Sequence, residues 1–339
     1  MQICICRISV KIKIGDITKI RTGKLDANAA DENGQYPFFT CSKEPLKINT
    51  YSYDCECVLV AGNGDLNVKY YNGKFDAYQR TYIIEDDSDG LLFMPYLYFF
   101  MESYIDELRK QSIGGVIKYI KLKNLTDALI ELPSIEVQRK IVNIISKSKE
   151  IVRRKENEFE LLDELVKARF VEMFGEIEDC DKWESKIWNE VVTIKNGRDY
   201  KKVLVSDGGY PVVGTGGEIA RASKYLCPEN TIVVGRKGSI NNPMLMKEKF
   251  WNVDTAFGVI PNSDYLHYQY FYCFCKFYNF MKLNKATTLP STTKADLLKI
   301  RINIPPLELQ NQFASFVEEI NKSRLLSNHS LFLIKSIIF

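Results

Sequence analysis

The sequence has little of what most catalytic sites need. Its 339 residues contain only two histidines, one in an aromatic segment and one near the C-terminus, which leaves no Ser-His-Asp triad to assemble. The phosphate-binding spacing Gly-x-x-x-x-Gly-Lys-Ser/Thr is also absent. Residues 241–244, Asn-Asn-Pro-Met, lack the second proline and the aromatic residue of an amino-methyltransferase signature, so we interpret them as a turn. We therefore expect no catalytic and no cofactor-binding residues in this chain.

A cysteine framework is absent as well. The nine cysteines are odd in number and scattered, and no secretory leader precedes them, which fits reduced thiols in a cytoplasm. We expect the pairs Cys4/Cys6, Cys55/Cys57 and Cys273/Cys275 each to lie on one face of a strand. None of these pairs has the C-x-x-C spacing of a zinc site, so no metal site is expected.

Neither strong charge nor a long apolar run is present. The net charge is only +3, which argues against a polycationic protein and leaves nucleic-acid binding to local patches. Residues 181–300 are the more cationic part, with 17 Lys and Arg against 11 Asp and Glu. No segment approaches the roughly 20 apolar residues of a membrane span. We expect a cytoplasmic protein that does not enter membranes.

What the sequence does contain is a long internal repeat. At an offset of 174 residues, Gly23, Tyr36, Pro37 and Gly64 recur as Gly197, Tyr210, Pro211 and Gly238. At an offset of 172, Leu125, Ile130, Pro133, Glu136 and Gln138 recur as Leu297, Ile302, Pro305, Glu308 and Gln310. A repeat of this length is a duplicated domain and not a solenoid unit.

Two long helices follow the repeated domains. Glycine and proline are missing between Pro133 and Gly175, and apolar residues recur there at spacings of three and four, which predicts a helix over 137–175. From Val137 to Phe174 it would be about 57 Å long. A second helix is expected over 309–339. The apolar seams of the two helices comprise Ile141, Ile144, Ile151, Phe159, Leu162, Val166, Phe313, Phe316 and Ile320.

The predicted fold class is therefore α+β. Two similar domains of mixed sheet and helices, residues 1–136 and 176–308, are separated by two long spacer helices that pair as an antiparallel coiled coil. In register with the first helix, Phe339 stands opposite Lys167, so the second helix is the shorter of the two. A shortened gene product and a partner-binding tail are both compatible with this.

Candidate DNA-binding residues cluster around a glycine-rich turn. Residues 235–239, Gly-Arg-Lys-Gly-Ser, follow an apolar strand and would present backbone donors and two cations to a phosphate or a base edge. The candidates in the second half are Arg221, Lys224, Arg236, Lys237, Ser239, Asn241, Lys285, Thr287 and Ser291. Those in the first half are Asn63, Asp65, Asn67, Tyr70 and Arg80, with Asn suited to adenine and Asp to cytosine. A solvated hairpin is the alternative for the turn, and ordinary turn chemistry is the alternative for Asn63 and Asp65.

The whole pattern resembles the specificity subunits of type I restriction-modification systems. The residues that carry the resemblance are Leu132–Gln138 and Ile304–Gln310, together with Tyr210–Gly217, Val233–Ser239 and Trp251–Thr255. The first half departs from it, with Ala-Gly-Asn-Gly-Asp at 61–65 in place of the turn at 235–239.

The resemblance implies a non-catalytic subunit. Its two target recognition domains would read the two halves of a bipartite site in double-stranded DNA. The helices would set the gap between them and dock DNA adenine methyltransferase subunits and, through these, restriction and translocase subunits. S-adenosylmethionine, ATP and magnesium are implied only for those partners. The alternative is a truncated or silent copy that acts as an assembly scaffold or a recombination partner, and an exposed apolar seam would also allow self-association.

Overall fold

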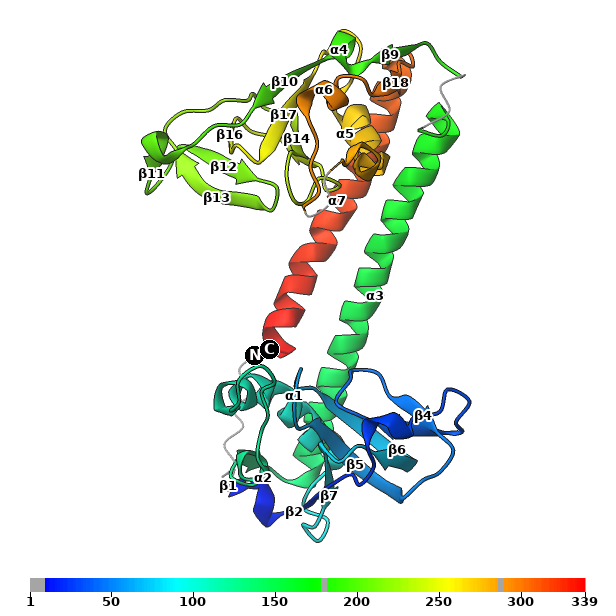
Figure 1. The fold of residues 1–339 in the computed structure, drawn as a ribbon, viewed down its shortest axis with the longest axis vertical. Helices are drawn as coiled ribbons and strands as arrows, with labels where there is room; N and C mark the ends of the chain where they lie inside the picture. The colour runs from blue at the N-terminus through cyan, green and yellow to red at the C-terminus, as the bar shows by residue number, and fades with distance from the viewer. Residues whose placement is uncertain (1–9, 178–181, 286–288, 339) are drawn as a thin grey trace. The chain divides into compact units, whose positions relative to one another are not determined.

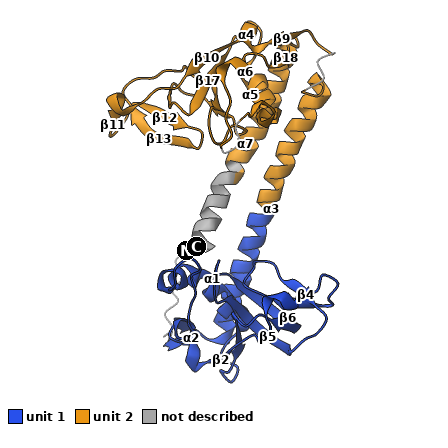
Figure 2. Ribbon diagram, viewed as in Figure 1, with its two compact units in different colours: residues 1–153, 333–339 blue, residues 154–332 orange. Residues whose placement is uncertain are grey.

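The computed structural model describes residues 10–177, 182–285 and 289–338. The chain divides into two compact units, residues 1–153 with 333–339 and residues 154–332 (Figure 2). The division falls inside the long helix α3, Ile135–Phe174, so each unit contains part of that helix. The domain boundaries expected from the sequence stay predictions.

A six-stranded sheet forms the centre of the first unit, in the order β2-β7-β5-β6-β3-β4 (Figure 1). Its strands are β2 Thr18–Thr22, β3 Tyr36–Phe39, β4 Leu46–Ile48, β5 Tyr53–Ala61, β6 Val68–Ala77 and β7 Thr81–Asp86. Side chains alternate along β5, so that Val58 and Val60 pack in one core with Leu97, whereas Cys57 and Leu59 pack in another with Phe75. Both faces of this strand are therefore buried from Cys57 to Ala61, whereas Asp54 and Glu56 are exposed.

The remaining elements of the first unit follow the sheet. The helices are α1 Met94–Gln111 and α2 Leu122–Thr126, with short 3-10 turns η1 Ile14–Asp16 and η2 Ala27–Ala29. A separate pair of antiparallel strands, β1 Val10–Lys13 and β8 Leu129–Leu132, directly precedes α3. The alternation of apolar and polar residues over 3–14 predicts a strand there, and β1 lies within this segment. Residues 1–9, with Cys4 and Cys6, lie outside the described part of the chain.

The second unit repeats this arrangement with smaller sheets. One sheet has the order β10-β17-β14-β15 and another β11-β13-β12-β16, and β9 pairs with β18. The strands are β9 Ser185–Ile187, β10 Val192–Asn196, β11 Leu204–Val205, β12 Tyr210–Gly214, β13 Gly217–Ala222, β14 Thr231–Gly235, β15 Met244–Met246, β16 Trp251–Asn252, β17 Ala256–Pro261 and β18 Arg301–Asn303. The order β10-β17-β14 corresponds to β2-β7-β5, and β18 paired with β9 corresponds to β8 paired with β1.

The helices of the second unit surround an aromatic core. They are α4 Trp188–Val191, α5 Tyr268–Phe277, α6 Lys294–Leu297 and α7 Leu307–Ile338, with 3-10 turns η3 Lys201–Val203 and η4 Phe280–Leu283. Phe170 and Phe174 of α3 contact Phe313 near the start of α7. Asp163 lies earlier in α3 and pairs with Arg324, which lies later in α7. The two helices therefore run antiparallel, and the α+β class with its long helices is confirmed.

Two expectations about local structure need adjustment. Cys55 and Cys57 lie on β5 as expected, but Cys273 and Cys275 lie on α5, so the strand expected there is wrong. Two residues apart on a helix, they do not share a face, and both are buried because α5 is surrounded by the core. The aromatic residues over 91–101 predict a helix there; the observed helix α1 begins at Met94 and extends to Gln111, since apolar residues continue at Ile105 and Leu108.

Candidate nucleic-acid interface

The turn at 235–239 is held rigidly by backbone hydrogen bonds. The Arg236 N–H donates to the Thr255 carbonyl at 2.8 Å, and the Gly238 N–H donates to the Pro290 carbonyl at 2.9 Å. The Thr292 hydroxyl donates to the Gly235 carbonyl at 2.8 Å. Gly238 has φ +81°, a conformation that glycine adopts without strain. The turn and the segment 290–292 thus form one surface element of the second unit.

The side chains on this turn differ in the contacts that they make within the protein. The Arg236 guanidinium lies 5.8 Å from the centre of the Phe257 ring and donates to the Asp254 carbonyl at 3.5 Å. Lys237 and Ser239 are exposed. Asn241 has a structural role, since its Oδ1 accepts the Phe280 N–H at 2.8 Å and ties the turn to η4. Lys237 and Ser239 are therefore the residues of this turn that are best placed to meet a ligand.

The segment after η4 supplies further candidates. Lys237 and Ser291 are paired through an antiparallel bridge, and the Ser291 N–H donates to Asn284 Oδ1 at 3.0 Å. Lys285 Nζ lies 2.9 Å from Asp296 Oδ1, and the hydrogen bond from Lys285 lowers the pKa of Asp296. Thr287 lies outside the described residues. Of these candidates, the structure brings Ser291 directly beside the turn.

Arg221 and Lys224 belong to another sheet. Arg221 is on β13, where its Nε lies 2.7 Å from Glu218 Oε1 and its Nη1 donates to the Gly209 carbonyl at 3.4 Å. Lys224 is exposed just after β13. Among the described residues, no hydrogen bond or ion pair joins Arg221 to the turn at 235–239. Its guanidinium is engaged in stabilising the β12–β13 hairpin.

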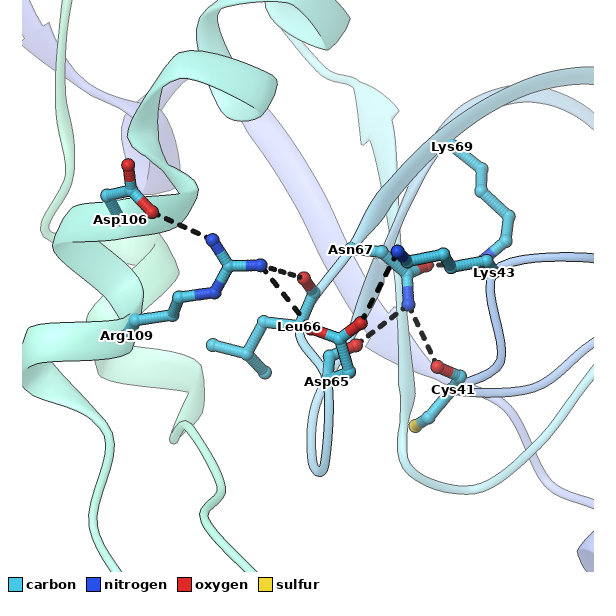
Figure 3. A network of polar contacts seen from close by, with 8 residues as sticks. All are labelled: Cys41, Lys43, Asp65, Leu66, Asn67, Lys69, Asp106 and Arg109. Atoms are coloured by element: carbon cyan, nitrogen blue, oxygen red, sulfur yellow. Dashed lines mark hydrogen bonds and ion pairs between the residues drawn. The ribbon is translucent and has the colours of Figure 1, made fainter. Parts of the chain in front are cut away.

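In the first unit, Asp65 and Asn67 are centres of a polar network (Figure 3). Asn67 Nδ2 donates to the Cys41 carbonyl at 2.8 Å and to the Asp65 carbonyl at 2.9 Å, and its Oδ1 accepts from Lys69. The Asp65 carboxylate lies between two cations, at 3.3 Å from Arg109 and 3.8 Å from Lys43. Both side chains therefore hold the loop between β5 and β6 in place.

The other first-half candidates are distributed around this loop. The Tyr70 hydroxyl donates to Glu56 Oε1 at 2.7 Å, and burial together with this hydrogen bond raises the pKa of Tyr70 to about 12. Arg80 is exposed and lines a cavity of about 150 Å³. Its carbonyl accepts the Gly62 N–H at 2.8 Å, which places the backbone of Arg80 next to the turn that contains Asn63.

The two units share one way of pairing a turn with a loop. In the first unit, the Gly64 N–H donates to the Lys118 carbonyl at 2.9 Å and Asn63 bridges Tyr119. In the second unit, Gly238 donates to Pro290 and Lys237 bridges Ser291. The loop Ile113–Tyr119 was not among the residues expected from the sequence. The offset of 172 that relates Gln138 to Gln310 also relates Lys118 to Pro290 and would have identified it.

The expected helix seams divide into buried and exposed positions. Phe313 and Val166 are buried in the core of the second unit, and the half-buried Phe316 and Ile320 pack against it. Phe159 and Leu162 of α3 are also half-buried. Asp163 accepts hydrogen bonds from Lys276 and Arg324; burial acts to raise its pKa, but these two cations lower the pKa overall. In the first part of α3, Ile141 is half-buried, whereas Ile144 and Ile151 are 57% and 45% exposed.

The described part of the chain has neither a metal-binding cluster nor a membrane-spanning helix. No group of three or more His, Cys, Asp or Glu side chains there is arranged to hold a metal ion. None of the described helices has both the length and the apolarity that crossing a bilayer requires.

Comparison with known proteins agrees with the fold and with the duplication. A family model described as type I restriction modification DNA specificity domain matches twice, at residues 9–161 and 180–331. The specificity subunit of the type I restriction enzyme EcoDI from Escherichia coli is 45% identical over 123 residues, which is 36% of this chain. That match spans only 27% of the EcoDI subunit.

Solved structures match over nearly the whole chain. The S subunit of a type I restriction-modification system from M. genitalium superposes with a TM-score of 0.69 at 15% identity, covering 100% of this chain and 96% of that one. A structure described as the basis of complex assembly and conformational transition of a type I system gives 0.56, also at 15% identity, with 97% and 95% covered. At this identity the structures support the fold alone. The two family-model matches cover most of the sequence, and the chain therefore belongs to the family of type I restriction-modification DNA specificity proteins.

Proposed function

We propose that this chain is the sequence-reading specificity subunit of a type I restriction-modification complex. The observation that carries the proposal is the turn–loop pair found once in each unit, with equivalent backbone hydrogen bonds and different side chains. Each pair lies inside one of the two segments that match the DNA specificity domain. A repeated backbone that presents different polar groups suits a protein that reads two different short sequences.

The target of such a subunit is bipartite. The first unit presents Asn63 and Arg80 near its turn, an amide and a guanidinium, whereas the second presents Lys237 and Ser291. These groups differ in the base edges and phosphates that they can contact, so each unit would recognise its own half-site. The bases between the half-sites would remain unread.

Partner docking is assigned to the long helices. Ile144 and Ile151 are two exposed apolar residues seven positions apart on α3, and this spacing places them on one face of the helix. An exposed apolar stripe is typical of a surface that another helix covers. We assign this face to methyltransferase subunits, which would in turn bring the restriction and translocase subunits.

In this complex the chain contributes no catalytic residue. Methylation of adenine with S-adenosylmethionine, and DNA cleavage with ATP and magnesium, would belong to the partner subunits. Since the substrate is chromosomal DNA, the complex would act in the cytoplasm.

The proposal is tested by mapping adenine methylation with long-read sequencing in cells that express the chain with its neighbouring methylation subunit. A split methylated motif should be lost when the chain is deleted and return when the wild-type gene is supplied. Complementation with the double variant Lys237→Ala/Ser291→Ala should alter only one half of the motif. If no motif depends on the chain, the proposed function is wrong, and a scaffold role without DNA reading takes its place.

A further inference from the structure

The loop between α1 and α2 exposes two adjacent apolar side chains at its tip. Val116 is fully exposed and Ile117 is 63% exposed, and both are β-branched residues that ordinarily pack in a core. Because both side chains are exposed, they bury little apolar surface within their own unit. Such a feature is typical of a contact with a partner.

The tip is held in a defined conformation. Ile113 and Tyr119 exchange two backbone hydrogen bonds, of 3.0 and 2.8 Å, which close the loop at its base. Gly114 has φ +118°, and a Cβ at this position would lie 2.6 Å from the Ile117 carbonyl oxygen, so only glycine fits. The loop therefore holds residues 115–117 at its exposed tip.

The base of the loop is joined to the candidate interface. The Lys118 carbonyl accepts the Gly64 N–H, and Tyr119 pairs with Asn63 through a β-bridge, so the apolar tip lies next to the turn that would read DNA. Lys118 and Lys121 are exposed on the same segment. Apolar side chains flanked by lysines suit a contact with DNA. The lysines can meet the phosphates, and the apolar side chains can meet the stacked bases between them.

The second unit contains an equivalent apolar residue. Leu289 stands 172 positions after Ile117, the same offset that relates Lys118 to Pro290, and it is 53% exposed. It adjoins Pro290, whose carbonyl accepts the Gly238 N–H, and Lys237 is exposed on the paired turn. The recurrence of an exposed apolar residue at this position in both units favours a shared role over chance.

We propose that Val116 and Ile117 of the first unit and Leu289 of the second enter a groove of the DNA and contact the bases through apolar surfaces. This inference rests on the proposed function and adds to it a second kind of readout, beside the polar groups of the turns. Apolar side chains recognise thymine methyl groups or separate a flexible base step, and both contacts depend on sequence.

The test uses the full chain assembled with its methylation subunits and a pool of randomised DNA duplexes, from which bound sequences are selected and read. The variants are Val116→Thr/Ile117→Thr and, separately, Leu289→Asn. Leu129→Thr and Leu204→Asn are the matched controls, because these leucines are exposed apolar residues of the same two units outside the loops. Each loop variant should reduce discrimination at one or two positions of a single half-site by roughly 5- to 100-fold, and the controls should not.

The experiment distinguishes failure of this inference from failure of the proposed function. If the wild type selects a split motif and both loop variants select the same motif with the same discrimination, the inference is wrong and the proposed function stands. Loss of the methylation subunits from the complex, with an unchanged motif, would assign the tips to a protein partner and also overturn it. If the wild type selects no motif, the proposed function fails and this inference fails with it. Replacing thymine by uracil in the selected duplexes then identifies the contact: a loss that matches the loop variants indicates thymine methyl groups, and an unchanged affinity indicates a base step.

Discussion

The side-chain oxygen of Gln310 accepts the backbone N–H of His267 at 2.8 Å. Its amide nitrogen donates to the carbonyls of Tyr265 and Pro305, at 2.9 and 2.8 Å. Gln138 makes the same three contacts in the first unit, with the Phe93 N–H and the carbonyls of Leu91 and Pro133. Both glutamines are completely buried. One side chain thus joins the start of each long helix to the segment that leads into the aromatic helix.

Replacing Gln310 by Leu should destabilise the second unit. Three backbone groups, of which the Pro305 carbonyl is buried and the other two are partly buried, would lose their partner, and an unsatisfied buried polar group costs about 1–3 kcal/mol. All three tryptophans of the chain lie in this unit, so urea unfolding followed by tryptophan fluorescence reports on it selectively. Gln312→Leu is the control, because Gln312 is exposed on the same helix. Equal unfolding midpoints for the two variants would contradict this prediction.

Gly197→Ala should also destabilise the second unit. A Cβ at Gly197 would lie 1.8 Å from the Val253 carbonyl oxygen, which is backbone and cannot move aside without disturbing the strands. We expect a loss of about 1–3 kcal/mol or more in the free energy of unfolding. Gly216→Ala is the matched control, since nothing lies within 4 Å of a Cβ there. An unchanged stability of Gly197→Ala would show that the close approach of the two segments is not required.

Lys237→Ala should weaken DNA binding in a salt-dependent way. If this exposed lysine contacts a phosphate, its removal lowers the slope of log affinity against log salt by about 1 and weakens all sequences alike. If it contacts a base, discrimination falls instead and affinity drops by roughly 1–3 kcal/mol. Fluorescence anisotropy of the assembled complex on its mapped motif between low and moderate salt measures both quantities. Lys247→Ala, an exposed lysine beyond β15, should change neither.

The stability of the second unit should depend on Asp163 in acid. Its pKa is lowered from 3.8 by Lys276 and Arg324, so its charged form stabilises the folded state above the unfolded pKa. This contribution is lost as the pH falls below about 4 and through the lowered folded value. Asp163→Asn should therefore show a smaller drop in urea stability over that range than the wild type. Glu160→Gln, an exposed carboxyl on the same helix, should leave the wild-type drop intact.

The sequence was sufficient to predict the duplication and the long helices. The duplication follows from residues that recur at a constant offset, and the helices follow from apolar residues spaced three and four apart. Gly23 and Gly197 recur because each lies against a carbonyl oxygen, of Ala77 and Val253, that leaves no room for a side chain. Gly64 and Gly238 recur because each turn needs positive φ. Positions of this kind tolerate only glycine, so the same residue occurs in both copies and the repeat can be recognised in the sequence.

The roles of individual polar residues could not be predicted in the same way. Asp65 and Asn67 have the side chains that read bases, yet their partners Arg109 and Cys41 lie 44 and 26 residues away, and sequence alone does not bring them together. Asn241 is similar, since its acceptor oxygen is used by Phe280. The contact proposed for the apolar loop tips could not be predicted either, because nothing in the residue type of Ile117 or Leu289 suggests a nucleic-acid contact.

The bonds between turn and loop have a consequence for how such a protein can change. Gly64 with Lys118, and Gly238 with Pro290, are joined through backbone atoms alone, and these contacts are indifferent to the side chains that the two segments display. Substitutions at the neighbouring exposed positions therefore leave the scaffold intact. Under the proposed function, each unit could therefore acquire a new preferred sequence by a few surface replacements, while its strands and helices stay as they are.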